Sequence, residues 1–193
     1  MSGGPVRASD IPNLITVARL LLVPPIIACL LSERYGWGLV LFVIAGVSDA
    51  LDGFLAKQFG WHSRLGGLLD PIADKTLLVS CYLALTWQGL LPVWLTALVI
   101  GRDLVILVGA ILYNALVERL EASPSVVSKL NTLSQLLLVV AELFNYGAQT
   151  LPAGWLDILV YTVLATTVLS GLDYVWTWGW RAWNKKHGSG RFP

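Results

Sequence analysis

Residues 49–75, DALDGFLAKQFGWHSRLGGLLDPIADK, join the end of one long apolar run to the start of the next. This stretch contains two pairs of aspartates: Asp49 and Asp52 are three positions apart, and Asp70 and Asp74 are four apart. Both spacings place two carboxylates on one face of a helix. If the flanking runs are helices, the short polar connection between them makes them antiparallel neighbours. The sequence therefore predicts four carboxylates that converge at one end of a helix pair.

The composition indicates an integral membrane protein. Hydrophobic residues make up 56% of the chain and charged residues 13%, whereas a soluble domain carries about 25% charged residues. The net charge of +1 gives no basic field for nucleic acid, and we expect no nucleic-acid partner. Cys29 and Cys81 lie in apolar stretches and are expected to pack as small hydrophobic side chains.

Six segments are long and apolar enough to cross a membrane, which takes about 20 residues. Turn residues or charges separate them. We expect a single all-α membrane domain over residues 1–193, with the first segment retained as a helix because it lacks the features of a cleaved signal. The six expected transmembrane helices lie near residues 12–32, 37–56, 66–87, 92–115, 127–147 and 153–176.

The distribution of basic residues predicts the orientation. With six spans, both termini lie on the same side as the 57–65 and 116–126 connections, and the opposite connections carry only Arg34. The positive-inside rule places the richer side, and with it the aspartate site, in the cytoplasm. The basic residues on that side are Arg7, Lys57, Arg64, Arg119, Arg181, Lys185, Lys186 and Arg191.

The four aspartates predict a divalent-cation site. An aspartate at the bilayer centre costs about 2.5–3.5 kcal/mol, and four together repel one another, so a cation is expected to compensate. Hard cations such as Mg²⁺ and Mn²⁺ prefer carboxylate oxygens, whereas a zinc site would need more nitrogen or sulfur than the isolated His62 offers. The alternative is that the four are unrelated helix-end residues.

Small residues and donors surround the aspartates. Gly53 and Gly66 would let a bulky anionic ligand approach, although glycine in a membrane helix also serves close helix packing. Lys57, Ser63 and Arg64 supply hydrogen-bond donors, and for the two basic residues anchoring at the cytoplasmic face is the alternative.

These residues resemble the signature of the CDP-alcohol phosphotransferase family, D-x2-D-G-x2-A-R-x8-G-x3-D-x3-D. Every spacing is kept, and the one departure is Lys57 where the family usually has arginine. Lysine keeps the charge but loses the planar fork of a guanidinium, so phosphate contact there is expected to be weaker or differently arranged. The matching positions are Asp49, Asp52, Gly53, Ala56, Gly66, Asp70 and Asp74.

The resemblance implies roles that spacing alone does not supply. It implies that the four aspartates bind two divalent ions, and that Asp74 is also the general base that takes the acceptor's proton. It further implies that the cytidine diphosphate lipid contacts Gly53, Lys57, Ser63 and Gly66, and that Asn13 lies near the nucleotide. A helix cap is the alternative for Asn13. Relatives of this kind are commonly dimers, which implies a homodimer, and we expect the protein to lie in the bacterial inner membrane.

Polar residues elsewhere suggest an acceptor pocket. Arg102 lies within the fourth span and could hold an anionic acceptor with Asp103 as its orienting partner, or the two could form only an intramembrane ion pair. Lys129 and Thr132 share a face of the fifth span and could join that pocket, although snorkelling also explains Lys129. No role is assigned to Glu142.

The resemblance leaves two acceptors open. Residues 100–105 and 123–135 look closer to the cardiolipin synthase branch, in which CDP-diacylglycerol and phosphatidylglycerol give cardiolipin and CMP. The other branch uses glycerol 3-phosphate and makes phosphatidylglycerophosphate. More remote alternatives are an intramembrane prenyltransferase, which also uses paired aspartate motifs with Mg²⁺, and a cation transporter that uses the carboxylates as its ion site.

Overall fold

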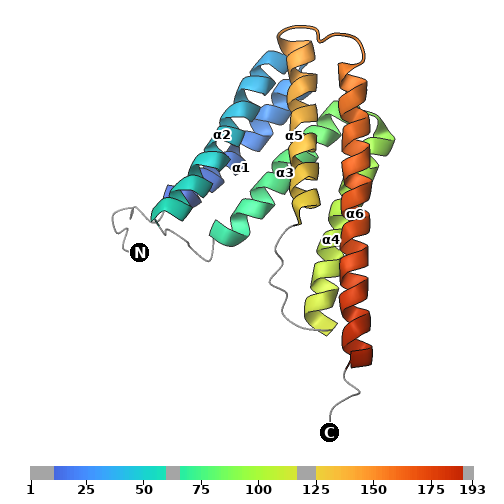
Figure 1. The fold of residues 1–193 in the computed structure, drawn as a ribbon. Helices are drawn as coiled ribbons and strands as arrows, with labels where there is room; N and C mark the ends of the chain where they lie inside the picture. The colour runs from blue at the N-terminus through green and yellow to red at the C-terminus, as the bar shows by residue number, and fades with distance from the viewer. Residues whose placement is uncertain (1–10, 60–65, 117–124, 189–193) are drawn as a thin grey trace, which may run out of the picture. The chain divides into compact units, whose positions relative to one another are not determined.

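The computed structural model describes the backbone of residues 11–59, 66–116 and 125–188, with side chains over 14–51, 53–54, 58, 72–109 and 125–177. These residues form helices joined by turns and contain no strand, which confirms the all-α prediction (Figure 1). Six helices follow one another along the described chain: α1 (Ile11–Leu31), α2 (Tyr35–Phe59), α3 (Gly66–Trp87), α4 (Val93–Leu116), α5 (Val126–Gly147) and α6 (Trp155–Gly188).

The first five helices begin and end within three residues of the predicted spans. The sixth differs, because α6 continues to Gly188 although its apolar run was expected to end near residue 176. Hydropathy marks where a chain leaves an apolar environment, whereas a helix ends only where its backbone hydrogen bonding stops. A polar continuation of a membrane helix therefore escapes a prediction based on apolar length.

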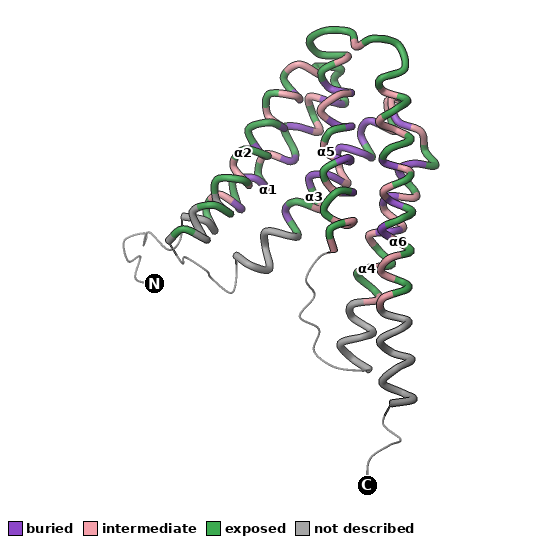
Figure 2. Tube along the Cα trace, viewed as in Figure 1, coloured by how far each residue is buried: buried purple, intermediate pink, exposed green. Residues whose placement is uncertain are grey.

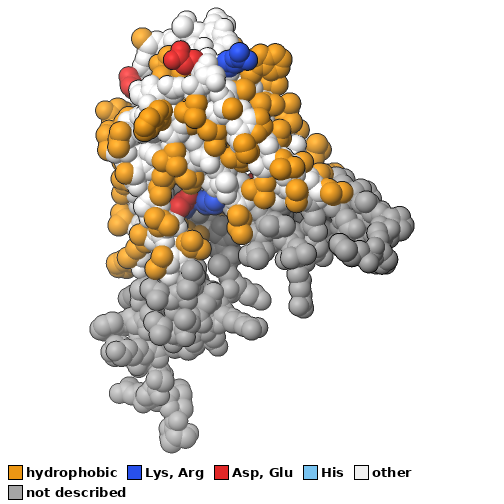
Figure 3. Space-filling model, turned by 180° about the vertical axis from the view of Figure 1, so that it is seen from behind, with side chains coloured by type: hydrophobic (Ala, Val, Ile, Leu, Met, Phe, Trp, Pro, Cys, Tyr) orange, Lys and Arg blue, Asp and Glu red, His pale blue; other side chains and the backbone are white. Residues whose placement is uncertain are grey.

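The described surface fits a membrane. Three helices are long and apolar enough to cross one over residues with described side chains: Leu14–Leu31, Val126–Gly147 and Trp155–Thr177. In α2 the described residues include a further apolar stretch, Tyr35–Leu51. Figure 3 shows a face on which hydrophobic side chains dominate and charged side chains are few. In Figure 2 most of the described length of α6 is exposed or intermediate, as expected of a lipid-facing helix. The protein is an integral membrane protein.

The helices group into two compact units. The first comprises Met1–Leu91 and Val139–Ala153 and so contains α1, α2, α3 and the end of α5. The second comprises Pro92–Leu138 and Gly154–Pro193 and contains α4, the start of α5 and α6. A single membrane domain over the whole chain remains a prediction.

In the first unit, α1 packs against both α2 and α3. That α2 and α3 are direct neighbours remains a prediction. The core of this unit includes Ile26 and Leu30 of α1 and Tyr82 and Leu85 of α3, all of which are inaccessible to solvent. At the end of α1, the Gln88 side-chain amide donates to the backbone carbonyl oxygens of Leu30 and Leu31, each at 3.1 Å.

The start of α2 meets the end of α5 backbone to backbone. A Cβ added to Gly36 would lie 2.9 Å from the carbonyl oxygen of Gly147, and one added to Gly147 would lie 2.7 Å from the Cα of Gly36. Tyr35 and Tyr146 flank this contact with ring centroids 5.7 Å apart. Glycine is needed at both positions because any side chain would separate the two backbones.

In the second unit, α4 packs against α6, and a polar network joins α5 to α6. Oδ1 of the fully buried Asn131 accepts hydrogen bonds from the hydroxyls of Thr166 at 3.1 Å and Thr167 at 2.8 Å. Ser134 completes the network through a 2.9 Å contact with the Thr166 hydroxyl. Such bonds hold membrane helices together because both sides of the interface are otherwise as apolar as lipid.

Candidate functional site

Arg19 of α1 joins the two aspartate-bearing helices of the first unit. Its Nη1 atom lies 2.8 Å from Oδ1 of Asp49 on α2 and 2.6 Å from Oδ1 of Asp74 on α3. One nitrogen thus bonds carboxylates from two different helices, so their two oxygens lie no farther apart than the sum of these distances. The convergence predicted for the aspartates therefore holds for Asp49 and Asp74.

The exposure of this cluster is uneven. The Arg19 side chain is 1% exposed, whereas those of Asp49 and Asp74 are 44% and 47% exposed. The guanidinium therefore lies on the protein side of the cluster, and both carboxylates keep open surface. A buried cation needs such partners, because an unpaired charge removed from water is strongly destabilising.

The remaining residues of the predicted site are placed by their backbone alone. Asp52 and Lys57 lie on α2 and Gly66 and Asp70 lie on α3, but their side chains are outside the described residues, as is that of Asn13 on α1. Both aspartate pairs fall within helices, as their spacing requires. Ser63 lies outside the described residues altogether.

Gly53 lies on the described part of α2 and is exposed. A Cβ built there meets no atom within 4 Å, so the surface beside Asp49 and Asp52 is open at this point. The helix backbone can therefore be approached here by a bulky group, as the sequence suggested.

The ligand atoms that these residues offer suit a hard divalent cation. Asp49 and Asp74 offer only oxygen ligands and are drawn together on an open surface, which suits Mg²⁺ or Mn²⁺. Among the residues with described side chains, no group of three histidine, cysteine, aspartate or glutamate residues is close enough to bind a metal by itself. A complete site would therefore also need Asp52 and Asp70.

Arg102 forms a second polar cluster, in the second unit. Its Nη1 donates to Oδ1 of Asp103 at 2.8 Å, and its Nη2 donates to Oγ of Ser128 at 2.7 Å and to Oγ of Ser170. The guanidinium carbon lies 5.7 Å from the ring centroid of Tyr174, a cation–π distance. The intramembrane ion pair weighed from the sequence is thus present, and both terminal nitrogens of Arg102 have protein partners.

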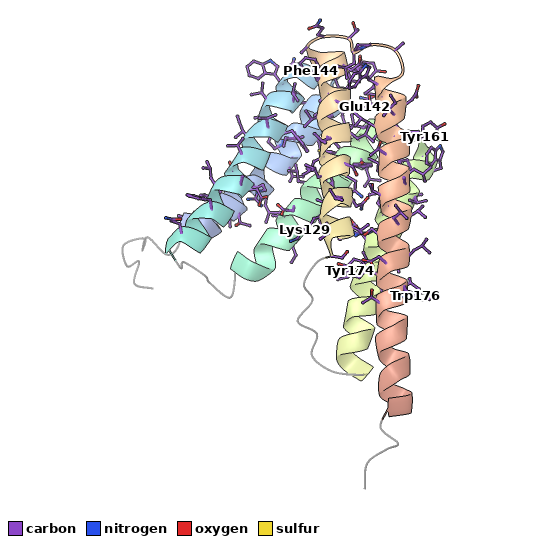
Figure 4. All side chains as sticks on the ribbon, viewed as in Figure 1. Lys129, Glu142, Phe144, Tyr161, Tyr174 and Trp176 are labelled. Carbon is purple, nitrogen blue, oxygen red and sulfur yellow. The ribbon has the colours of Figure 1, made fainter. Side chains whose placement is uncertain are left out.

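Lys129 and Thr132 lie next to this cluster on α5. The Lys129 side chain is exposed, and Figure 4 shows it near the start of the helix, while Tyr174 projects from α6. The Thr132 hydroxyl donates to the backbone carbonyl of Ser128 at 3.2 Å, so it is occupied within its own helix. Ser128 links this turn to Arg102.

Two features of these clusters did not follow from sequence reasoning. No role was assigned to Arg19 from the sequence, although an arginine inside an apolar run is itself a functional signal. Ser170, which bonds Arg102, lies 68 positions away. A single serine in an apolar helix gives no signal of its own.

Glu142 of α5 is 3% exposed, and its Oε2 atom has no hydrogen-bond partner among the described residues. It belongs to the first unit, and Figure 4 shows it toward the end of α5 where that helix approaches the start of α2.

Taken together, these features define an all-helical integral membrane protein with paired carboxylates held open at a helix junction. The chain belongs to the CDP-alcohol phosphatidyltransferase family: the family model matches residues 9–175. This family depends in general on divalent metal ions.

Individual relatives carry two kinds of name. The chain is 36% identical over 185 residues to rat cardiolipin synthase (CMP-forming), covering 85% of this chain and 60% of the relative. It is 32% identical over 193 residues to a chloroplastic CDP-diacylglycerol–glycerol-3-phosphate 3-phosphatidyltransferase from rice, an alignment that covers 90% of this chain and 58% of the relative. It is 33% identical over 186 residues to a probable phosphatidylglycerophosphate synthase from Mycobacterium tuberculosis, an alignment that covers 89% of this chain and 83% of the relative. The chain thus spans about three fifths of the length of the rat and rice relatives.

Proposed function

We propose that the protein transfers a phosphatidyl group from CDP-diacylglycerol to phosphatidylglycerol, giving cardiolipin and CMP. The observation that carries the proposal is the convergence of Asp49 and Asp74 on Arg19 within the family signature. The rat and human relatives named cardiolipin synthase, at 36% and 35% identity, support the choice of acceptor.

In the proposed reaction, the acceptor's hydroxyl oxygen bonds to the phosphorus of the phosphatidyl group. The bond between that phosphorus and the oxygen of CMP breaks, and the hydroxyl proton passes to the carboxylate of Asp74. Arg19 holds this carboxylate in place through its hydrogen bond to Oδ1, and a carboxylate positioned beside the acceptor hydroxyl can serve as the general base. The 47% exposure of the side chain leaves room for the acceptor to reach it.

Asp49, Asp52, Asp70 and Asp74 would hold two divalent ions, Mg²⁺ or Mn²⁺. When bound, these ions neutralise the pyrophosphate and stabilise the leaving CMP. The chain's own contribution is to bring carboxylates from α2 and α3 to one place, which Arg19 does for Asp49 and Asp74.

The donor lipid would bind beside these aspartates. We assign contacts with the cytidine diphosphate group to Gly53, Lys57, Ser63 and Gly66, and a place near the nucleotide to Asn13. The open surface at Gly53 supports this assignment. Lys57 would contribute a point charge to the phosphates where most of the family has a guanidinium.

The anionic acceptor would bind at Arg102, Lys129 and Thr132. The exposed ammonium group of Lys129 is available for a first contact. Arg102 would have to exchange Ser128 or Ser170 for a phosphate oxygen, or use its Nε atom, which has no partner among the described residues. Asp103 would keep the guanidinium oriented during either change.

Glycerol 3-phosphate is the second candidate acceptor. The rice relative is named for that acceptor and the mycobacterial one for phosphatidylglycerophosphate synthesis, and both align over most of this chain. The same aspartates and the same leaving group would serve either acceptor, so the chemistry of transfer is unchanged.

The proposal also covers the location and the assembly of the protein. We place it in the bacterial inner membrane, and the distribution of its basic residues supports an orientation with both termini and the aspartate site in the cytoplasm. The homodimer and the single membrane domain stay predictions.

The test is an assay of the purified protein in detergent micelles with CDP-diacylglycerol, Mg²⁺ or Mn²⁺, and each acceptor in turn. CMP and cardiolipin formed with phosphatidylglycerol support the first candidate, and phosphatidylglycerophosphate formed from glycerol 3-phosphate supports the second. Ion flux in proteoliposomes without CMP release would favour the transporter, and neither product with either acceptor refutes both candidates.

A further inference from the structure

Arg19 stands out because its charge is buried while the two aspartates that it bonds, Asp49 and Asp74, are exposed. Nη1 bonds Oδ1 of Asp49 at 2.8 Å and Oδ1 of Asp74 at 2.6 Å, with the arginine 1% exposed. A guanidinium placed only to anchor a helix would lie at the water interface. Here it lies inside, directly behind the carboxylates to which the proposed function assigns the metal ions.

The position also serves both helices at once. Because α1 packs against α2 and against α3, its cation can hold one carboxylate from each. Without a cation between them, two carboxylates at this separation repel each other, and each gains by turning toward water. Arg19 therefore does, in the metal-free protein, part of what a bound cation would do.

We infer that Arg19 is a built-in counter-cation: it keeps Asp49 and Asp74 together without metal and lowers the site's affinity for divalent ions. The inference rests on the proposed metal role of these aspartates. It goes beyond that role, because it assigns to α1 a part in setting how tightly the ions are held. Weaker binding would allow the divalent ions to dissociate from the site and rebind.

Two opposing effects decide what removal of Arg19 does. Loss of its orienting hydrogen bonds weakens metal binding, and outer-shell changes of this kind cost about 10–100-fold. Loss of a positive charge a few ångströms from a divalent ion strengthens binding, by more than about 100-fold at an effective dielectric constant of 20. The charge effect is the larger, so a neutral residue at this position should bind metal more tightly.

The experiment measures Mn²⁺ binding by electron paramagnetic resonance and thermal unfolding, both on the full chain in detergent micelles. Arg19→Gln removes the charge, Arg19→Lys keeps it, and Arg34→Gln changes an exposed arginine at the other end of α1. We expect Arg19→Gln to unfold at lower temperature in EDTA and to bind Mn²⁺ about tenfold more tightly. Arg19→Lys should stay within about threefold of the wild-type affinity, and Arg34→Gln should match wild type.

The possible results distinguish the counter-cation role of Arg19 from the metal role of the aspartates. If wild type binds Mn²⁺ and Arg19→Gln binds it equally or more weakly, the counter-cation role is wrong while the metal site stands. If wild type binds no Mn²⁺, the metal role in the proposed function fails and the inference fails with it. If Arg19→Gln is unfolded in EDTA, purification in Mn²⁺ should restore the folded protein, and a protein unfolded under both conditions overturns the inference.

Discussion

Asp49 of α2 and Asp74 of α3 bond the same nitrogen atom, Nη1 of Arg19 on α1. The two carboxylates are thus held in one place by a third helix. This relationship makes the roles of the two aspartates separable by experiment, because each can lose its charge while the other keeps its bond to Arg19.

Asp74→Asn should abolish phosphatidyl transfer. Asparagine has nearly the same shape but cannot accept the acceptor's proton, and loss of a general base costs about 10²–10⁴-fold in rate. CMP release from CDP-diacylglycerol measures the effect. Asp157→Asn, at an exposed position in the first turn of α6, is the matched control and should keep wild-type activity. More than a tenth of wild-type activity in Asp74→Asn would rule out its role as the base.

Asp49→Asn should raise the Mg²⁺ concentration needed for half-maximal activity by at least about tenfold. It removes a charged ligand, and even outer-shell changes cost about 10–100-fold in metal affinity. Ser48→Ala is the neighbouring control, since the Ser48 hydroxyl donates to the carbonyl of Ile44 within its own helix. An unchanged metal dependence of Asp49→Asn would show that this carboxylate is not a ligand.

Arg102→Lys should raise the KM for the acceptor about tenfold or more while leaving the KM for CDP-diacylglycerol unchanged. Lysine keeps the charge but cannot reproduce the forked contacts of the guanidinium with Asp103, Ser128 and Ser170. Arg34→Lys, at an exposed position, is the control. If Arg102→Lys lowers thermal stability and leaves both KM values unchanged, Arg102 serves the fold alone.

Gly147→Ala should destabilise the protein by about 1–3 kcal/mol, the usual cost of forcing atoms into a packed contact. The new methyl group would lie 2.7 Å from the Cα of Gly36, and backbone atoms there cannot move aside as a flexible side chain can. Thermal unfolding in detergent measures the change. Gly46→Ala is the control, because a Cβ at Gly46 meets nothing within 4 Å. Equal melting temperatures for the two variants would contradict the close packing of α2 and α5.

Thr167→Val should destabilise the protein by about 0.6–2 kcal/mol, the range for hydrogen bonds between membrane helices. The Thr167 hydroxyl donates to the buried Oδ1 of Asn131 at 2.8 Å, and valine keeps the shape without the donor. Thr162→Val is the matched change on the same helix, since its hydroxyl bonds the carbonyl of Ile158 one turn earlier. A comparable loss of stability in both variants would mean that the α5–α6 network adds nothing specific.

Local chemistry was enough to predict the helices. The length of each apolar run determines where a membrane helix can form, and the first five helices begin and end within three residues of the predicted limits. The spacing of Asp49 from Asp52, and of Asp70 from Asp74, likewise determines that each pair shares a helix face. These are properties of a few neighbouring residues, so they can be derived without knowing what the helix packs against.

Only the tertiary structure decided which residues complete each cluster. Arg19 reaches Asp49 and Asp74 because α1 packs against both of their helices, and Arg102 reaches Ser128 and Ser170 across separations of 26 and 68 positions. In lipid, apolar helix faces are nearly interchangeable as packing surfaces, so the pattern of a single helix does not specify its neighbour. The choice of partner depends on contacts between distant parts of the chain, and those contacts exist only once the helices have packed.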